Sequence, residues 1–236
     1  HIERADYAIF ADPGAEHPKT YEMLEWLLAW RFFNKGIPIY VEKKNLLRDT
    51  MRGTNSLGKK FVTIPAFSES GGMVQRQCTG EYKIWTVKDK VRELQGLKPR
   101  QRMKPCEMWL GITIDEASRM KESRMYNIEY KYPLIELKLR RSDCINFFKK
   151  NDFPIPMKSS CVFCPYHSDS FWKEIKKENG SAWKTAIKVD KTIRDASKRG
   201  LTDKLFLHRS HLPLEDVQFA DQIDLFEEEC EGFCGL

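Results

Sequence analysis

The sequence lacks any apolar run long enough to cross a membrane, and it lacks an export signal. Its first residues, His1-Ile2-Glu3-Arg4, carry charge where a secretory signal would carry a long apolar stretch. The chain also lacks an initiating Met, so we interpret it as a fragment or as a trimmed product. Hydrophobic residues make up 41% of its 236 residues, enough for a packed core. We expect a cytoplasmic protein without membrane partners.

Internal repeats and low-complexity segments are absent too, and the cysteines lack the even number of a disulfide framework. The chain contains seven cysteines, an odd number, at uneven spacing. A secreted disulfide framework normally uses an even number, whereas cytosolic proteins keep their thiols reduced. The count therefore favours reduced thiols in a cytosolic setting, and it leaves open what those thiols hold.

An excess of charge of one sign is present but modest. The sequence has 40 basic and 34 acidic residues, a net charge of +6. Basic clusters occur at residues 98–102, 138–141 and 149–150. One interpretation is a solvated, salt-bridged surface, and the other is a groove for nucleic acid or for a polyphosphate nucleotide.

The hydrophobic pattern predicts an α/β fold. Residues 5–11 have the composition of a buried strand, residues 18–36 show helical periodicity that Gly36 ends, and residues 37–41 again resemble a strand. A strand, a helix and a strand at this spacing form a βαβ unit, which predicts a parallel sheet flanked by helices in a Rossmann-like arrangement. Further along we expect a helix over 83–94 and a strand over 107–114.

The C-terminal part is predicted to be mainly helical. Residues 141–143 have the composition of a helix cap, followed by a helix through Lys150, and two more helices are expected over 168–177 and 182–198. We therefore divide the chain into an α/β nucleotide-binding part, residues 1–140, and a helical lobe with cysteines, residues 141–236.

The most informative motif is the pair Cys161 and Cys164, which follows a loop broken by Pro154 and Pro156. A Cys-x-x-Cys turn directs two sulfurs at one soft metal ion or one iron–sulfur cluster. Two thiols do not close such a site, so other cysteines must complete it. Cys78 and Cys144 are the candidates, and no role is predicted for Cys106.

The order of motifs resembles the phosphoadenylylsulfate reductase-like branch of the PP-loop ATP pyrophosphatase family, which has the adenine nucleotide alpha-hydrolase fold. The motifs that carry this resemblance span most of residues 5–170. They are Phe10 to Glu16 with Thr20-Tyr21, Arg76 to Lys83, Gly111 to Glu116 with Arg119 and Arg124, Tyr132 to Asp143, and Cys161 to Cys164.

One motif of that family is missing. Its signature Ser-Gly-Gly phosphate loop, which should follow the first strand, would lie before His1. Ser70-Gly71-Gly72 follows the wrong strand and lacks the closing Ser or Thr, so we interpret it as an ordinary loop. Either the phosphate loop was cut off upstream or the protein does not hydrolyse ATP.

The resemblance implies a nucleotide site for ATP or phosphoadenylylsulfate with Mg²⁺. Asp12 and Gly14, at the end of a strand, lie where ligands bind in parallel α/β sheets. Four cations would hold the anionic groups of the nucleotide. They are Arg76, Lys83, Arg119 and Arg124. For any one of them the alternative is a solvated surface side chain.

The resemblance also implies a [4Fe-4S] cluster. Its predicted ligands are Cys78, Cys144, Cys161 and Cys164. Two alternatives remain open: the same thiols bind Zn²⁺, or the fourth iron stays open for a substrate sulfide. His167 is favoured for capping or packing over ligation. Cys230 and Cys234, near the C-terminus, are the predicted catalytic thiols, because reductases of the family attack sulfur with a cysteine of their C-terminal tail.

The resemblance leads us to expect an iron–sulfur enzyme that transfers sulfur to an adenylated nucleotide or nucleic acid, with tRNA or DNA as acceptor. The rival enzyme is a reductase of adenylylated sulfate. A third reading is a catalytically inactive nucleotide-binding subunit of a defence or mobile-element complex, with partner subunits. The stretch 206–213, with His208, Arg209 and His211, either lines the substrate pocket or packs.

Overall fold

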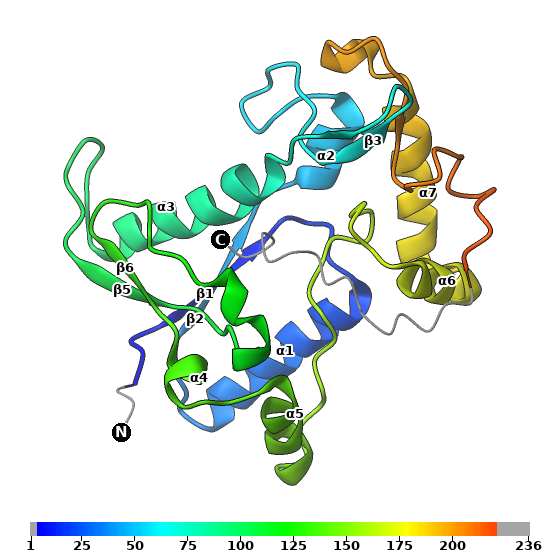
Figure 1. Ribbon diagram of the computed structural model, residues 1–236. Coiled ribbons are helices and arrows are strands. Elements are labelled where there is room, and N and C mark those ends of the chain that lie inside the picture. The colour runs from blue at the N-terminus through cyan, green and yellow to red at the C-terminus, as the bar shows by residue number, and fades with distance from the viewer. Residues whose placement is uncertain (1–3, 221–236) are drawn as a thin grey trace. The chain divides into compact units, whose positions relative to one another are not determined.

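The structure is a computed structural model, and it describes residues 4–220 (Figure 1). Within this range the chain divides into two compact units, each made of segments that alternate along the sequence. Unit 1 consists of residues 4–10, 22–41 and 87–157, and unit 2 of residues 11–21, 42–86 and 158–220. The boundary predicted after residue 140 divides the chain by expected function, into a nucleotide-binding part and a cysteine-bearing part. The two compact units are a different division, and the predicted boundary stays a prediction.

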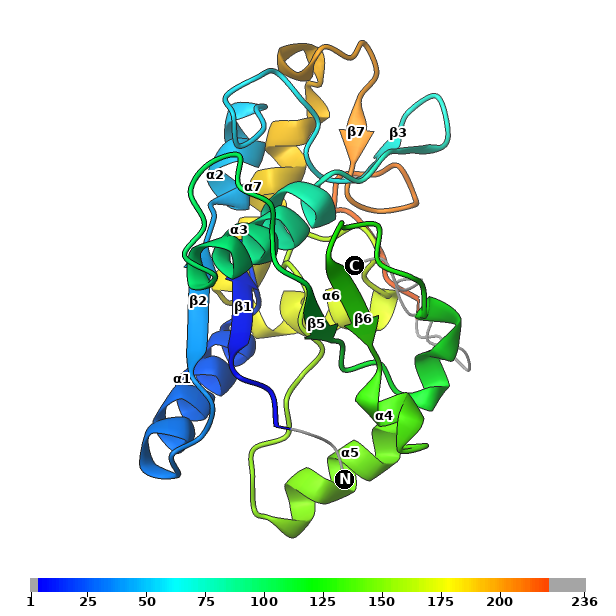
Figure 2. The ribbon, with the colours of Figure 1, turned by 90° about the vertical axis from the view of Figure 1, so that its left-hand side faces the viewer.

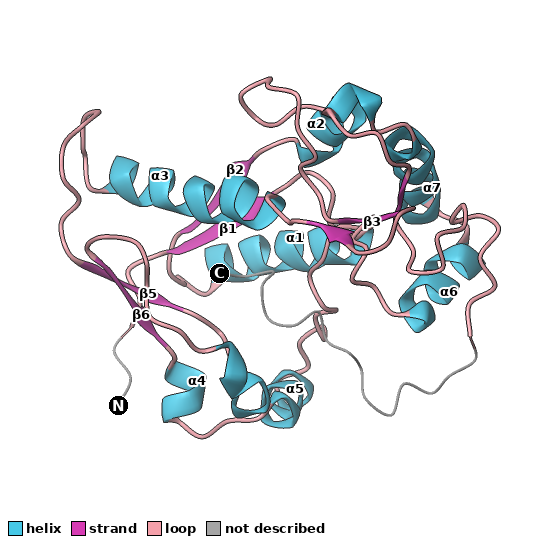
Figure 3. Cartoon of the chain, turned by 45° about the horizontal axis from the view of Figure 1, so that its top comes forward, coloured by secondary structure: helices cyan, strands magenta, loops and turns pink. Residues whose placement is uncertain are grey.

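Two pairs of parallel strands are present, shown in magenta in Figure 3. Strand β1 (Ala8–Asp12) pairs with β2 (Ile39–Lys43), and helix α1 (Pro18–Phe33) connects them. Strand β5 (Cys106–Trp109) pairs with β6 (Ile128–Lys131), with Cys106 opposite Ile128. Parallel pairs flanked by helices confirm the α/β prediction in its coarse form. Two short pairs do not by themselves establish the nucleotide-binding sheet that the resemblance implies.

Three predicted boundaries differ from the structure. The strand expected over 107–114 ends at Trp109, and a 3₁₀ helix, η2 (Ile114–Arg119), soon follows. The helix expected from Lys83 begins earlier, as the π-helix η1 (Thr79–Ile84), and continues as α3 (Trp85–Leu94). Helix α5 (Arg141–Lys150) is capped by Arg140, whose backbone N–H donates to Asp143 Oδ2 at 2.8 Å. Asp143 is thus the third helical residue and not the cap.

Unit 1 has a small core between α3 and the β5–β6 pair. The buried side chains of Val91, Met103 and Ile128 form it, with Met108 and Tyr130 packed against them. The short helix α4 (Pro133–Glu136) begins at a proline, which suits the first turn of a helix. Ile9 of β1 also packs against this core, so the first strand of the chain contacts elements from residues 87–136.

Unit 2 contains the larger core and an antiparallel sheet that the sequence did not predict. Strand β3 (Ala66–Ser68) lies between β4 (Met73–Val74) and β7 (Leu205–Phe206). Helix α7 (Ser181–Arg194) packs against α2 (Leu46–Arg52), α6 (Asp169–Glu178) and β7 (Figure 2). The 3₁₀ helix η3 (Ser197–Arg199) follows α7. The core is made of Leu46, Tyr82, Phe163, Trp172, Ile175, Ala186, Val189 and Leu207, among others.

Local sequence explains where the helices of unit 2 begin and end. The Ser168 hydroxyl accepts a hydrogen bond from the backbone N–H of Phe171 at 3.3 Å, which caps α6, and Asn179 ends it in a left-handed conformation. Helix α7 places Trp183, Ala186 and Val189 on one buried side. None of the helices within residues 4–220 has both the length and the apolar composition for a membrane span.

Candidate functional site

A pocket in unit 2 brings together five of the residues that the sequence singled out. Three thiols, Cys78, Cys161 and Cys164, line it with the side chains of Arg76 and Lys83. Much of the remaining wall is apolar and includes Pro13, Leu46, Ile64 and Phe163. Soft sulfur ligands and two cations thus share an otherwise apolar pocket, where electrostatic interactions are less screened than in water.

The Cys-x-x-Cys segment is a turn fixed at both ends. The backbone N–H of Cys164 donates to the carbonyl of Cys161 at 2.9 Å, and the N–H of Val162 donates to Ala15 at 2.8 Å. Val162 and Phe163 are buried, whereas both cysteines are half-buried. The two residues between the cysteines therefore anchor the turn in the core, and the thiols are left at the pocket wall.

His167 contacts the backbone of this turn and does not line the pocket. Its Nε2 lies 2.8 Å from the carbonyl oxygen of Cys161, and its ring stacks on Phe171 with centroids 3.6 Å apart. Trp172 meets the same ring edge-on. These contacts give the imidazole a packing role, in agreement with the interpretation favoured from the sequence.

Cys78 enters the pocket from the start of the π-helix η1. Tyr82, on this helix, is fully buried and donates its hydroxyl to Asp49 Oδ2 at 2.9 Å. Burial raises the pKa of Tyr82, and the hydrogen bond to Asp49 adds to the rise, so the phenol stays a donor. This anchored residue fixes the helix that carries Cys78 at one end and Lys83 at the other.

The sequence analysis missed a buried carboxylate that joins three segments of the site. Glu16, only 1% exposed at its side chain, accepts a hydrogen bond from Lys83 Nζ at 3.3 Å. Its other oxygen accepts from the Ser159 hydroxyl at 2.9 Å, and its backbone forms a β-bridge with Cys161. One residue thus connects the loop after β1, the π-helix and the cysteine turn. Its position two residues after Gly14, in a strand-end loop, is the only sequence signal for it.

A second missed residue lies beside Arg76. The Arg76 guanidinium carbon is 5.5 Å from the centroid of the Tyr166 ring. Tyr166 follows the cysteine turn by two residues, so this cation–π contact also connects the segment of Cys78 to that of Cys164. A guanidinium carries five N–H donors in a fixed plane, and this geometry matches the oxygens of a carboxylate or a phosphate.

Asp12 and Gly14 form the turn that precedes Glu16. Asp12 is buried and its Oδ1 accepts from the backbone N–H of Gly14 at 2.7 Å and from the Tyr21 hydroxyl at 2.8 Å. Burial and the bond to Asp12 raise the pKa of Tyr21. Gly14 has φ +69°, and an added Cβ would lie 3.1 Å from the Lys44 carbonyl, so a side chain is strained there. Pro13, between them, lines the pocket.

Three other predicted site residues lie in unit 1 and do not line the pocket. Cys144 is a half-buried residue of α5. Arg119, in η2, pairs with Glu116 of the same helix, and Arg124 is exposed in the loop before β6. The predicted catalytic thiols, Cys230 and Cys234, fall outside the described residues. The roles predicted for these five residues stay predictions.

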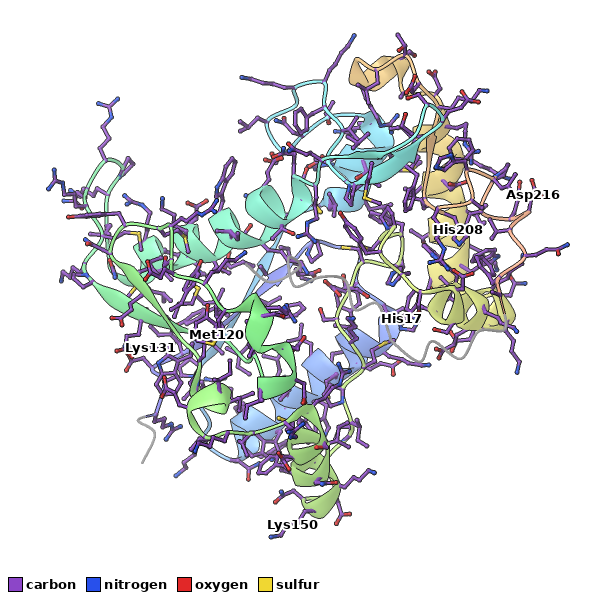
Figure 4. All side chains as sticks on the ribbon, viewed as in Figure 1. His17, Met120, Lys131, Lys150, His208 and Asp216 are labelled. Carbon is purple, nitrogen blue, oxygen red and sulfur yellow. The ribbon has the colours of Figure 1, made fainter. Side chains whose placement is uncertain are left out.

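The stretch 206–213 forms a separate polar cluster in unit 2. His208, labelled in Figure 4, is buried. Its Nε2 lies 3.3 Å from Asp169 Oδ1. Arg209 donates to the same oxygen at 3.0 Å, and the backbone N–H of Ala220 donates to Oδ2 at 3.2 Å. These bonds tie the segment after β7 to the start of α6, which is the packing role that the sequence analysis left open.

The donor chemistry of the pocket fits a metal held by thiolates. Three thiols from two separate segments share one wall, and the cations Arg76 and Lys83 would offset the negative charge of deprotonated cysteines. Within residues 4–220, no three His, Cys, Asp or Glu side chains are already close enough together to hold a metal ion. The three cysteines therefore line one pocket, but their sulfur atoms are not arranged as metal ligands. Metal binding requires these sulfur atoms to move closer to one another.

Comparison of the chain with protein-family models, with curated proteins and with solved structures finds no match. The resemblance to the phosphoadenylylsulfate reductase-like branch therefore rests on the sequence motifs alone.

Proposed function

We propose that this protein is an iron–sulfur enzyme that transfers sulfur to an adenylated nucleotide or nucleic acid. The observation that carries the proposal is the shared pocket of Cys78, Cys161, Cys164, Arg76 and Lys83. Thiols and cations on one wall suit a reaction in which sulfur chemistry takes place beside a polyphosphate. The order of motifs in the sequence supports the same function.

The two cations have different tasks in this proposal. Lys83, held by the Glu16 carboxylate, contributes a compact positive charge for a phosphate oxygen, and it is directed into the pocket without free rotation of its side chain. Arg76, next to the Tyr166 ring, donates to a second anionic oxygen. Together they bind ATP with its Mg²⁺ and stabilise the charge that develops on the leaving groups.

The proposed reaction has two displacements. In the first, a carbonyl oxygen of the acceptor attacks the α-phosphorus of ATP, and the bond from this phosphorus to pyrophosphate breaks. In the second, a sulfide supplied by a sulfur donor attacks the acceptor carbon, and its bond to oxygen breaks, so AMP leaves with that oxygen. No net oxidation or reduction occurs. The cysteines hold the metal group, which supplies a site for soft sulfur when bound.

Metal analysis after anaerobic purification is the first test. About four irons and four sulfides per chain, with absorbance near 400 nm, support the proposal and lead to assays of ATP–pyrophosphate exchange. One zinc without iron makes the cysteine site structural and rejects an iron–sulfur enzyme. Sulfite release from adenylylated sulfate without pyrophosphate exchange assigns the pocket to the rival reductase. A bound nucleotide with neither activity indicates the inactive binding subunit.

A further inference from the structure

The segment between α3 and β5 carries an unusual set of charges. Four basic residues lie within seven positions of unit 1, at Lys98, Arg100, Arg102 and Lys104, with no acidic residue among them. All four are exposed, and we call them the basic loop. The loop projects past the end of α3 (Figure 1).

The backbone of the basic loop is held in place by side chains of neighbouring residues. Arg92, in the last turn of α3, donates to the carbonyls of Lys98 at 3.1 Å and Gln101 at 3.0 Å. Gln95 bonds to both the N–H and the carbonyl of Lys104, at 2.9 and 3.0 Å. These contacts order the loop through its peptide groups, so the side chains of its cations are left to solvent.

Two further contacts strengthen this order. The Gln101 side chain accepts from the backbone N–H of Lys98 at 2.7 Å, and Met103 is buried against Val91 and Ile128. The loop therefore has an anchor in the core of unit 1, which is uncommon for a solvated run of charges. Ordering four like charges within a short loop costs electrostatic free energy that a bound polyanion would recover.

The cations of the basic loop make no ion pair with any residue between 4 and 220. Some other cations of unit 1 are paired, as Lys90 is with Glu93 at 2.8 Å and Lys131 with Glu129 at 2.5 Å. The contrast matters because unpaired, pre-ordered cations can bind phosphates without first breaking a salt bridge. The loop also lacks an exposed aromatic or large aliphatic side chain, which a membrane-binding loop would insert among lipids.

We propose that the basic loop binds the phosphodiester backbone of a nucleic acid. Arg100 stands at the tip, where its left-handed backbone (φ 68°) turns the chain, and the other cations flank it. Such contacts position a nucleic acid and carry no base sequence. That this nucleic acid is the acceptor of sulfur rests on the proposed function, whereas the binding itself does not.

The test measures binding of a fluorescent 20-base-pair DNA duplex and of an RNA hairpin by anisotropy over a range of salt concentrations. The variant K98Q/R100Q/R102Q/K104Q removes the four charges. We expect its affinity to fall about tenfold or more at about 100 mM salt, and its slope of log affinity against log salt to become shallower by about two to four. Circular dichroism confirms that the variant folds.

A matched control distinguishes the effect of the basic loop on binding from the effect of a lower net charge. The variant K59Q/K177Q/K184Q/K188Q removes four exposed lysines of unit 2. It should retain affinity within about threefold. Equal losses in both variants, or no binding by the unmodified chain, overturn the proposal. Loop-dependent binding to vesicles containing phosphatidylserine, without binding to either nucleic acid, assigns the loop to a membrane surface and also overturns it.

One further variant distinguishes failure of the nucleic-acid proposal from failure of the proposed sulfur-transfer function. C161A removes a thiol of the cysteine pocket and leaves the loop intact, so it should bind both nucleic acids as the unmodified chain does. Retained nucleic-acid binding, together with absence of iron from the unmodified chain, rejects the sulfur-transfer function alone. Loss of binding in C161A places the nucleic acid at the pocket and rejects the basic loop.

Discussion

The Glu16 carboxylate lies 3.3 Å from the ammonium nitrogen of Lys83, although 66 residues separate them along the chain. Glu16 is almost completely buried and Lys83 is 23% exposed at its side chain, so the carboxylate has little contact with water. A buried carboxylate requires a partner, since an unpaired charge in the interior is strongly disfavoured. Lys83 is thus held at the pocket wall by a residue that does not itself line the pocket.

Substitution of Glu16 tests this support. Glu16→Gln removes the charge and keeps the shape, so we expect the free energy of unfolding to fall by about 1–3 kcal/mol, because Lys83 and Ser159 lose a charged partner. Urea unfolding measures it. Lys19→Gln is the matched control, since Lys19 pairs with Glu174 and Glu178 on the surface. Its effect should stay below about 1 kcal/mol. Equal effects would show that the charge of Glu16 contributes no more to stability than a surface ion pair does.

Substitution of the pocket cations tests the nucleotide site. Arg76→Gln and Lys83→Gln should each weaken ATP binding about 10- to 100-fold, because each removes a charge-assisted hydrogen bond to a phosphate. Titration calorimetry with ATP and Mg²⁺ measures the dissociation constant. Lys88→Gln serves as control, because Lys88 lies in α3 and does not line the pocket. Unchanged affinity in both pocket variants removes these cations from the site.

The cysteines can be tested one at a time. Cys78→Ser, Cys161→Ser and Cys164→Ser should each reduce bound metal to less than about half, because a hydroxyl is a poor ligand for soft metals. Cys106→Ser should leave the metal content unchanged: Cys106 lies in unit 1, outside the pocket, and burial raises the pKa of its thiol. Cys144→Ser decides whether the predicted fourth ligand takes part. Elemental analysis and absorbance near 400 nm are the readouts.

The site was only partly predictable from the sequence. Cys161 and Cys164 could be found because their spacing alone implies a shared ligand, and Cys78 and Lys83 followed from their order in a motif. Glu16 could not, because a glutamate in a loop with glycine and prolines has the appearance of a surface residue, and only the tertiary fold brings it to Lys83 and Ser159. The pairing depends on how two distant segments pack, which hydrophobic periodicity does not encode.

The fold, like the site, was predictable from the sequence only in part. The first strand was predicted from a short apolar run, and the first helix from the apolar side chains between Pro18 and Gly36. The antiparallel sheet was missed because β4 and β7 have two residues each, too few for any alternation to appear. The π-helix at Thr79 was also missed, since one extra residue per turn leaves the composition of a helix unchanged.

The cluster around Asp169 predicts how stability responds to acid. Burial alone would raise the pKa of Asp169, but the hydrogen bonds from Ala220 and His208 and the charge of Arg209 outweigh it and hold that pKa below its usual value. Since the unfolded pKa is about 3.9, the ionised carboxylate stabilises the fold above that pH. This stabilisation is lost as the pH falls through the lowered pKa of the folded state.

The variant Asp169→Asn removes that pH dependence. At pH 6 we expect it to be less stable than the unmodified protein by about 1–2 kcal/mol, because the amide is uncharged and its NH2 group, in place of one carboxylate oxygen, cannot accept a hydrogen bond. The difference should narrow as the pH is lowered below about 4, where the wild-type carboxylate gains its proton. Urea unfolding between pH 6 and pH 2.5 measures both curves. A difference that stays constant over this range would assign the effect of the substitution to packing and reject an electrostatic role for Asp169.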